Sequence, residues 1–151
     1  MTCFYAFPGL FQKLKDQENL QSFSPHFMPM LALVIDDSML IRHTVCRFLE
    51  NRGFTVETAT DGIAALEALK SVRPDLIVTD LQMPRLSGYQ LIDALKANAE
   101  TAGIPVVILA ARPSPGNPQE TRAHNFIYKD MNVEEQLNQA METLFPPPVA
   151  T

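Results

Sequence analysis

Three aspartates are the residues of this sequence whose positions best suit chemistry. Asp36 and Asp37 directly follow the continuous apolar run Leu31–Ile35, and Asp80 directly follows a second run at residues 76–79. If these runs are neighbouring parallel strands, the three carboxylates converge, because sites in open α/β sheets lie at the carboxyl ends of strands. Carboxylates that lie so close together repel one another unless a cation binds between them. Mg²⁺ prefers such oxygen ligands. We therefore expect a Mg²⁺ site.

A lysine is expected at the same edge of the sheet. Lys129 follows residues 126–128, a weaker apolar run that predicts a fifth strand. A carboxylate nucleophile, a metal ion and a lysine together can accept a phosphoryl group, because the two cations neutralise the transferred oxygens. Taken singly, Asp36 and Asp37 could merely cap the next helix, and Lys129 could be an exposed side chain. The combination with Asp80 favours the site.

The elements that must position these residues alternate along the chain between strands and helices. Apolar runs predict strands at residues 31–35, 76–79, 105–109 and 126–128, and residues 54–60 are expected to form a further short strand. Apolar residues at helical spacing predict helices between them. The inward residues are expected to be Ile41, Val45, Phe48 and Leu49 before Gly53; Ile63, Leu66 and Leu69 after a capping Asp61; Leu91, Ile92 and Leu95 after Gly88; and Val133, Leu137, Met141 and Leu144 after a capping box of Asn132 and Glu135.

This alternation predicts an α/β fold. Strands that alternate with helices form βαβ units, and right-handed crossovers between them give an open parallel sheet with helices on both faces. We expect a doubly wound five-stranded parallel sheet in the order 2-1-3-4-5. In that order strands one and three are neighbours, which is what the convergence of the aspartates requires.

Composition limits the class of protein. The chain has 151 residues, of which 46% are apolar, and a formal net charge of −5, which suits one domain with a sizeable core. No apolar run approaches the ~20 residues of a membrane helix, and the acidic balance argues against a nucleic-acid surface. The two cysteines, Cys3 and Cys46, make no disulfide framework, so we expect a reducing, cytoplasmic location.

Three regions are expected along the chain. Residues 1–29 form an N-terminal extension that contains five of the nine phenylalanines, and they are either a docking arm or a non-native leader. Residues 30–145 form the domain. Residues 146–151 form a proline-rich tail, and because only these six residues follow Phe145, no output segment is expected after the domain.

The motifs around the candidate site resemble those of a known family. The sequence Val-Ile-Asp-Asp-Ser at residues 34–38, the spacing of Asp80, Met83, Pro84 and Gly88, and the position of Lys129 resemble the receiver domains of two-component response regulators. The resemblance covers about residues 30–145. It implies the flavodoxin-like version of the predicted sheet.

The resemblance also implies a role for each site residue. Asp80 would be the phosphoacceptor, and Lys129 would pair with the phosphoryl group. Mg²⁺ would be bound directly by Asp37, more through water by Asp36, and also by Asp80 and the backbone carbonyl of Gln82. The domain would catalyse at most its own phosphotransfer and dephosphorylation, so we do not expect a conventional enzyme.

The second half of the chain departs from the family. Ala110 occupies the position where receivers carry a threonine or serine, whose hydroxyl bonds the phosphoryl group. Phe126 occupies the aromatic switch position without that hydroxyl partner, and Asp130 replaces the usual proline. Three prolines and a glycine at residues 113–118 predict a shortened or irregular fourth helix. These switch positions are therefore degenerate.

Two functions remain open at this point. The first is a single-domain response regulator that takes a phosphoryl group from a histidine kinase or phosphotransfer protein and then binds an unknown downstream protein, with no nucleic-acid or membrane partner. The alternative is a phosphorylation-independent, receiver-like interaction module (a pseudo-receiver), which Ala110 and Asp130 favour. A Mg²⁺-dependent hydrolase is less favoured because the first-strand carboxylates are adjacent, and a dinucleotide-binding domain lacks its glycine-rich turn.

Overall fold

Five parallel strands form one sheet in the structure, a computed structural model that describes residues 29–111, 125–129 and 132–146. The strands lie in the order β2-β1-β3-β4-β5, and every neighbouring pair is parallel. This confirms the predicted doubly wound sheet. The strands are β1 (Leu31–Ile35), β2 (Thr55–Ala59), β3 (Leu76–Asp80), β4 (Val106–Ala110) and β5 (Asn125–Tyr128).

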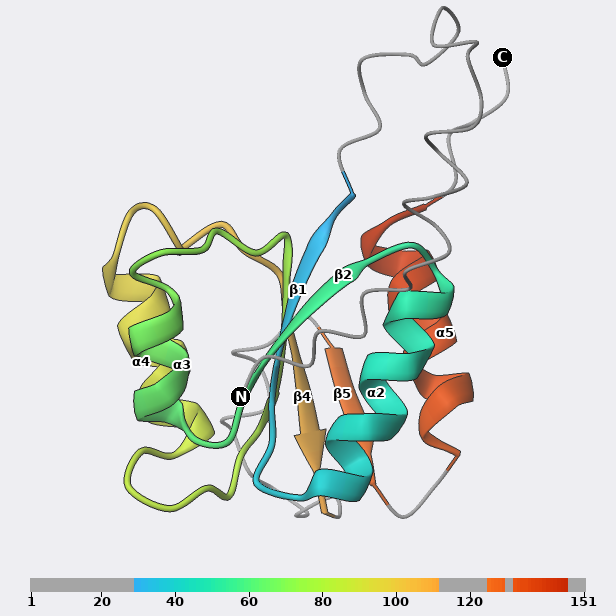
Figure 1. The fold of residues 1–151 in the computed structure, drawn as a ribbon, viewed down its shortest axis with the longest axis horizontal. Coiled ribbons are helices and arrows are strands. Elements are labelled where there is room, and N and C mark those ends of the chain that lie inside the picture. Colours follow the sequence, from blue (N-terminus) through green and yellow to red (C-terminus); the bar gives the residue numbers. More distant parts are fainter. Residues whose placement is uncertain (1–28, 112–124, 130–131, 147–151) are drawn as a thin grey trace, which may run out of the picture.

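Helices cover both faces of the sheet, as Figure 1 shows. Helices α2 (Met39–Asn51) and α5 (Val133–Leu144) lie on one face, and α3 (Gly62–Ala68) and α4 (Gly88–Ala97) lie on the other. Every residue of β3 and β4 is buried, because apolar side chains of these central strands pack into separate clusters on the two faces. None of the helices in the described ranges is long and apolar enough to span a bilayer.

Some predicted segments lie outside the described residues. These are nearly all of the N-terminal extension, the shortened fourth helix expected between β4 and β5, Asp130, and the tail after residue 146.

Side chains at the helix starts confirm part of the predicted capping. The Asp61 carboxylate accepts the backbone N–H of Ala64 at 2.8 Å, as predicted for the start of α3. Asn132 accepts the N–H of Glu135 at 3.4 Å, but the Glu135 carboxylate is bonded by the side-chain amide of Asn132, so only the first half of the expected box is seen. A complete capping box is found instead at the start of α4.

The predicted inward face of α3 is wrong at one position. Ile63 is 47% exposed, whereas Ala65 is fully buried and Leu69 is nearly so. Two residues along an α-helix rotate the side chain by about 200°, so a helix that buries Ala65 and Leu69 directs Ile63 toward solvent. The spacing of large apolar residues is misleading here because the small residue Ala65 lies on the buried side of the helix, within the apolar cluster.

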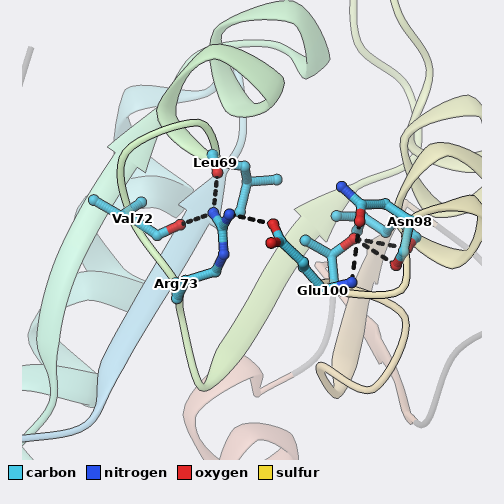
Figure 2. A network of polar contacts seen from close by, with 7 residues as sticks. Leu69, Val72, Arg73, Asn98 and Glu100 are labelled. Atoms are coloured by element: carbon cyan, nitrogen blue, oxygen red, sulfur yellow. Dashed lines mark hydrogen bonds and ion pairs between the residues drawn. The ribbon is translucent and has the colours of Figure 1, made fainter.

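An arginine joins the ends of α3 and α4 at the edge of the sheet that lies opposite the aspartates. The Arg73 guanidinium donates to the backbone carbonyls of Leu69 and Val72 and pairs with the Glu100 carboxylate, as Figure 2 shows. The backbone N–H of Glu100 donates in turn to the Asn98 side chain at 3.0 Å. The bond to Leu69 satisfies the carbonyl of the residue that caps the C-terminus of α3.

Candidate functional site

The three predicted aspartates lie together at the carboxyl ends of adjacent strands. Asp36 and Asp37 follow β1, Asp80 is the last residue of β3, and the register pairs Ile35 with Thr79. One carboxylate oxygen from each aspartate lies within 4.8 Å of the others. Asp36 and Asp80 are buried and Asp37 is exposed. Three oxygen donors on one side of a partly open site fit a hard divalent cation such as Mg²⁺, which retains several waters.

Lys129 completes this cluster from the next residue after β5. Its Nζ lies 2.8 Å from Asp36 Oδ2 and 2.9 Å from Asp80 Oδ2, and its side chain is only 19% exposed. The backbone N–H of Lys129 donates to the Ala110 carbonyl at 2.9 Å, which continues the pairing of β5 with β4. The lysine therefore bridges two buried carboxylates at the position that the sequence predicts for it.

Burial and charge oppose each other within this cluster. Burial raises the pKa of Asp36, and the neighbouring Asp80 carboxylate adds to the rise, while Lys129 and the N–H of Ser38 reduce it. Burial acts to lower the pKa of Lys129, but its bonds to Asp36 and Asp80 outweigh burial and raise that pKa. The lysine is thus held as a cation between the two carboxylates.

One backbone donor and one arginine orient the first carboxylate and its peptide. The N–H of Ser38 donates to Asp36 Oδ1 at 2.8 Å, and the Ser38 side chain makes no capping bond. Arg42 Nη1 donates to the Asp36 backbone carbonyl at 2.8 Å. Sequence reasoning missed Arg42, because an arginine one turn into a helix has no pattern that separates it from an exposed residue.

The loop after Asp80, residues 81–87, begins against the same site. The N–H of Gln82, whose carbonyl is a predicted metal ligand, donates to Asp80 Oδ1 at 3.2 Å. The N–H of Gly88 donates to the Leu81 carbonyl at 3.0 Å and closes the loop. A Cβ atom on Gly88 would lie 2.3 Å from the Asp80 carbonyl oxygen and 2.9 Å from Leu81 Cα, so only glycine fits there.

The two predicted switch positions lie on β4 and β5, on the face that α3 and α4 cover. Ala110 is the last residue of β4, is 6% exposed and pairs with Tyr128. Phe126 is half-buried and packs against the apolar cluster on this face. The end of β4 therefore presents a methyl group at the position where the resemblance to receivers implies a hydroxyl.

Comparisons with known proteins agree with this geometry. The family model described as the response regulator receiver domain matches residues 32–142. A relative, the response regulator MprA of Mycobacterium sp. (strain KMS), is 38% identical over 87 residues, which are 58% of this chain and 37% of that protein. The chain thus spans little more than a third of the length of this curated relative.

Solved structures show the same fold. Chemotaxis response regulator CheY4 of Vibrio cholerae superposes with a TM-score of 0.71 at 29% identity, covering 78% of this chain and 99% of that one. The response regulator protein TrrA of Thermotoga maritima, solved in complex with Mg²⁺ and BeF, superposes with a TM-score of 0.67 at 25% identity, covering 76% and 98%. The fold, the acidic cluster and the family match together show that the chain belongs to the response regulator receiver domain family.

Proposed function

We propose that this receiver domain accepts a phosphoryl group on Asp80 in a Mg²⁺-dependent reaction and signals by binding another protein. The observation that carries the proposal is the position of Lys129 Nζ, within 3 Å of both Asp36 and Asp80. A lysine placed in this way can neutralise negative charge on a phosphoryl group transferred to the neighbouring carboxylate.

The proposed donor is a phosphohistidine of a histidine kinase or phosphotransfer protein. An Asp80 carboxylate oxygen forms the new bond to phosphorus while the phosphorus–nitrogen bond breaks, and the electron pair leaves with the imidazole. Lys129 keeps its proton and pairs with the transferred oxygens. Asp80 is only 5% exposed, so the donor must approach along the edge of the sheet where Asp37 is open to solvent.

Mg²⁺ is the proposed cofactor, in line with its presence in the TrrA structure. Asp37 and Asp80 would hold it directly, Asp36 would hold it through water, and the Gln82 carbonyl would complete the protein ligands. When bound, the ion supplies positive charge at the transferred oxygens.

Mass spectrometry of the intact protein tests the acceptor. After incubation with a small phosphodonor and Mg²⁺, we expect the native chain to gain the mass of one phosphoryl group and Asp80→Asn to gain none. Asp93→Asn, which changes an exposed carboxylate of α4, is the matched control and should be labelled like the native chain. Equal labelling of Asp80→Asn and the native chain would show that another residue is the acceptor.

A phosphorylation-independent interaction module remains the second candidate, because Ala110 provides no hydroxyl at the end of β4. In that case the native chain would stay unlabelled under conditions that label an ordinary receiver, and partner binding would be the same for Asp80→Asn. Labelling of Asp80 together with a change in partner affinity would exclude the module.

A further inference from the structure

The loop after Asp80 contains a strained turn. Arg85 has a φ of +70°, and among the residues that the structure describes it is the only one other than glycine with a positive φ. The N–H of Leu86 donates to the Pro84 carbonyl at 2.8 Å, so the chain makes a three-residue γ-turn centred on Arg85. A γ-turn with positive φ at its centre is rare and unfavourable for a residue with a side chain. Contacts elsewhere must hold the turn in place.

Those contacts are made with the start of α3. The Arg85 guanidinium pairs with Asp61 Oδ2, while Asp61 Oδ1 accepts the N–H of Ala64. Asp61 is 4% exposed, so its carboxylate is fixed by the helix that it caps. The N–H of Ala64 lowers the pKa of Asp61, and Arg85 lowers it further, so the carboxylate stays charged. Leu86 lies against Gly62 so closely that a Cβ on Gly62 would be 2.8 Å from Leu86 Cβ.

We propose, on the basis of the proposed function, that Arg85 and Asp61 are positioning residues for the metal site. Their ion pair joins the β3–α4 loop to α3, and we call it the loop latch. The Gln82 carbonyl lies between two fixed parts of the loop: the bond from Gly88 to Leu81 at its base, and the loop latch at its tip. With both ends fixed, and with the Gln82 N–H bonded to Asp80 Oδ1, the peptide that follows Gln82 is confined to a narrow range of orientations.

Loss of the loop latch removes what offsets the strain at Arg85. The turn then relaxes to a more ordinary φ, and the Gln82 carbonyl samples a wider range of positions. Groups that orient metal ligands typically contribute about 10–100-fold to metal affinity. Because the Arg85 side chain is 60% exposed, solvent screens this pair, and we expect a smaller effect, about three- to tenfold.

Calorimetric titration with Mg²⁺ alone tests the loop latch. The variants are Asp61→Asn, which keeps the helix cap and loses the charge, Arg85→Met, which keeps the length of the side chain, and the double variant. We expect each single variant to bind Mg²⁺ about three- to tenfold more weakly than the native chain. The double variant should be no weaker than the weaker single variant, because both changes remove the same contact.

Glu100→Gln is the matched control. It breaks the exposed Arg73–Glu100 pair, which joins α3 and α4 at the opposite edge of the sheet (Figure 2). We expect its Mg²⁺ affinity to equal that of the native chain. A loss in Glu100→Gln as large as in Asp61→Asn would mean that general stability sets the affinity, and would overturn the proposal.

Hydrogen exchange in metal-free protein separates failure of the loop latch from failure of the proposed function. We expect the amides of Gln82 and Leu86 to exchange faster in Asp61→Asn and Arg85→Met than in the native chain. If the native chain binds Mg²⁺ and both variants bind it equally well, the loop latch is overturned and the proposed function stands. If the native chain binds no Mg²⁺, the proposed metal site is overturned, and unchanged amide exchange in the variants would overturn the loop latch as well.

Discussion

Replacing Lys129 with methionine tests the electrostatics of the site most directly. The change keeps the length and most of the apolar stem of the side chain but removes the charge between Asp36 and Asp80. Both carboxylates are almost inaccessible to solvent, and among the described residues Lys129 is the cation that pairs with them. We expect the metal-free variant to be markedly less stable than the native chain.

The magnitude follows from the spacing of the carboxylates. Their ligand oxygens lie within 4.8 Å of each other, where two unit charges repel by about 3.5 kcal/mol or more at an effective dielectric constant of about 20. Protonating a carboxyl group whose ordinary pKa is 3.8 costs about 4.4 kcal/mol at neutral pH, which limits the repulsion that the folded state must bear. Removing one partner of a buried ion pair typically costs about 3–5 kcal/mol. We therefore expect a loss of about 4 kcal/mol, or roughly 10–20 °C in Tm.

Thermal unfolding followed by circular dichroism, with and without millimolar Mg²⁺, measures this effect. In the native chain the ion must compete with Lys129 for two carboxylates, so the increase in Tm with Mg²⁺ should be larger for Lys129→Met. The double variant Lys129→Met/Asp80→Asn should regain much of the lost stability, because only one buried carboxylate remains. Lys70→Met, which breaks an exposed pair with Glu67, should change the stability by less than about 1 kcal/mol.

Two results would refute this reasoning. A metal-free Lys129→Met protein that unfolds within a few degrees of the native chain would show that the lysine does not offset repulsion between the carboxylates. A double variant no more stable than Lys129→Met would show that the loss comes from packing and not from charge.

Three further predictions follow from the structure. Gly88→Ala should destabilise the fold by about 1–3 kcal/mol in denaturant unfolding, because its Cβ would overlap backbone atoms, whereas Gly103→Ala, whose Cβ meets nothing within 4 Å, should change stability by much less. The pKa of Asp61 in the folded protein is below its unfolded value of 3.8, so the ionised carboxylate stabilises the fold above pH 3.8. This stabilisation is lost as the pH falls from 3.8 through the pKa of the folded protein, so over this range Tm should decline less steeply for Asp61→Asn than for the native chain. Ala110→Thr should strengthen the coupling between phosphorylation and the conformation around Phe126 by about 1–2 kcal/mol, seen as a larger phosphorylation-dependent amide shift at Phe126. A large shift in the native chain that the substitution leaves unchanged would show that the chain switches by another route.

Local patterns in the sequence were enough to predict the sheet and the cluster of Asp36, Asp37, Asp80 and Lys129 at its edge. The runs that become β1, β3 and β4 are mostly apolar because helices cover both faces of these strands, and two of them end at aspartates, Asp36 after β1 and Asp80 in β3. The expected order 2-1-3-4-5 is one of the common orders of doubly wound sheets, and it brings Asp36, Asp37 and Asp80 together. The resemblance to receiver domains came from the same residues, and the family match over residues 32–142 confirms it.

Only the tertiary structure decided how these residues contact one another. The burial of Asp36 beside an exposed Asp37, the bridging position of Lys129 and the exposure of Ile63 depend on side-chain directions that strand and helix periods leave undetermined. The pairing of Arg85 with Asp61 joins residues 24 positions apart through a turn with positive φ. Sequence periodicity reports which face of an element is buried, whereas such contacts depend on loop conformation and on where two distant elements meet, and packing of the whole domain sets both.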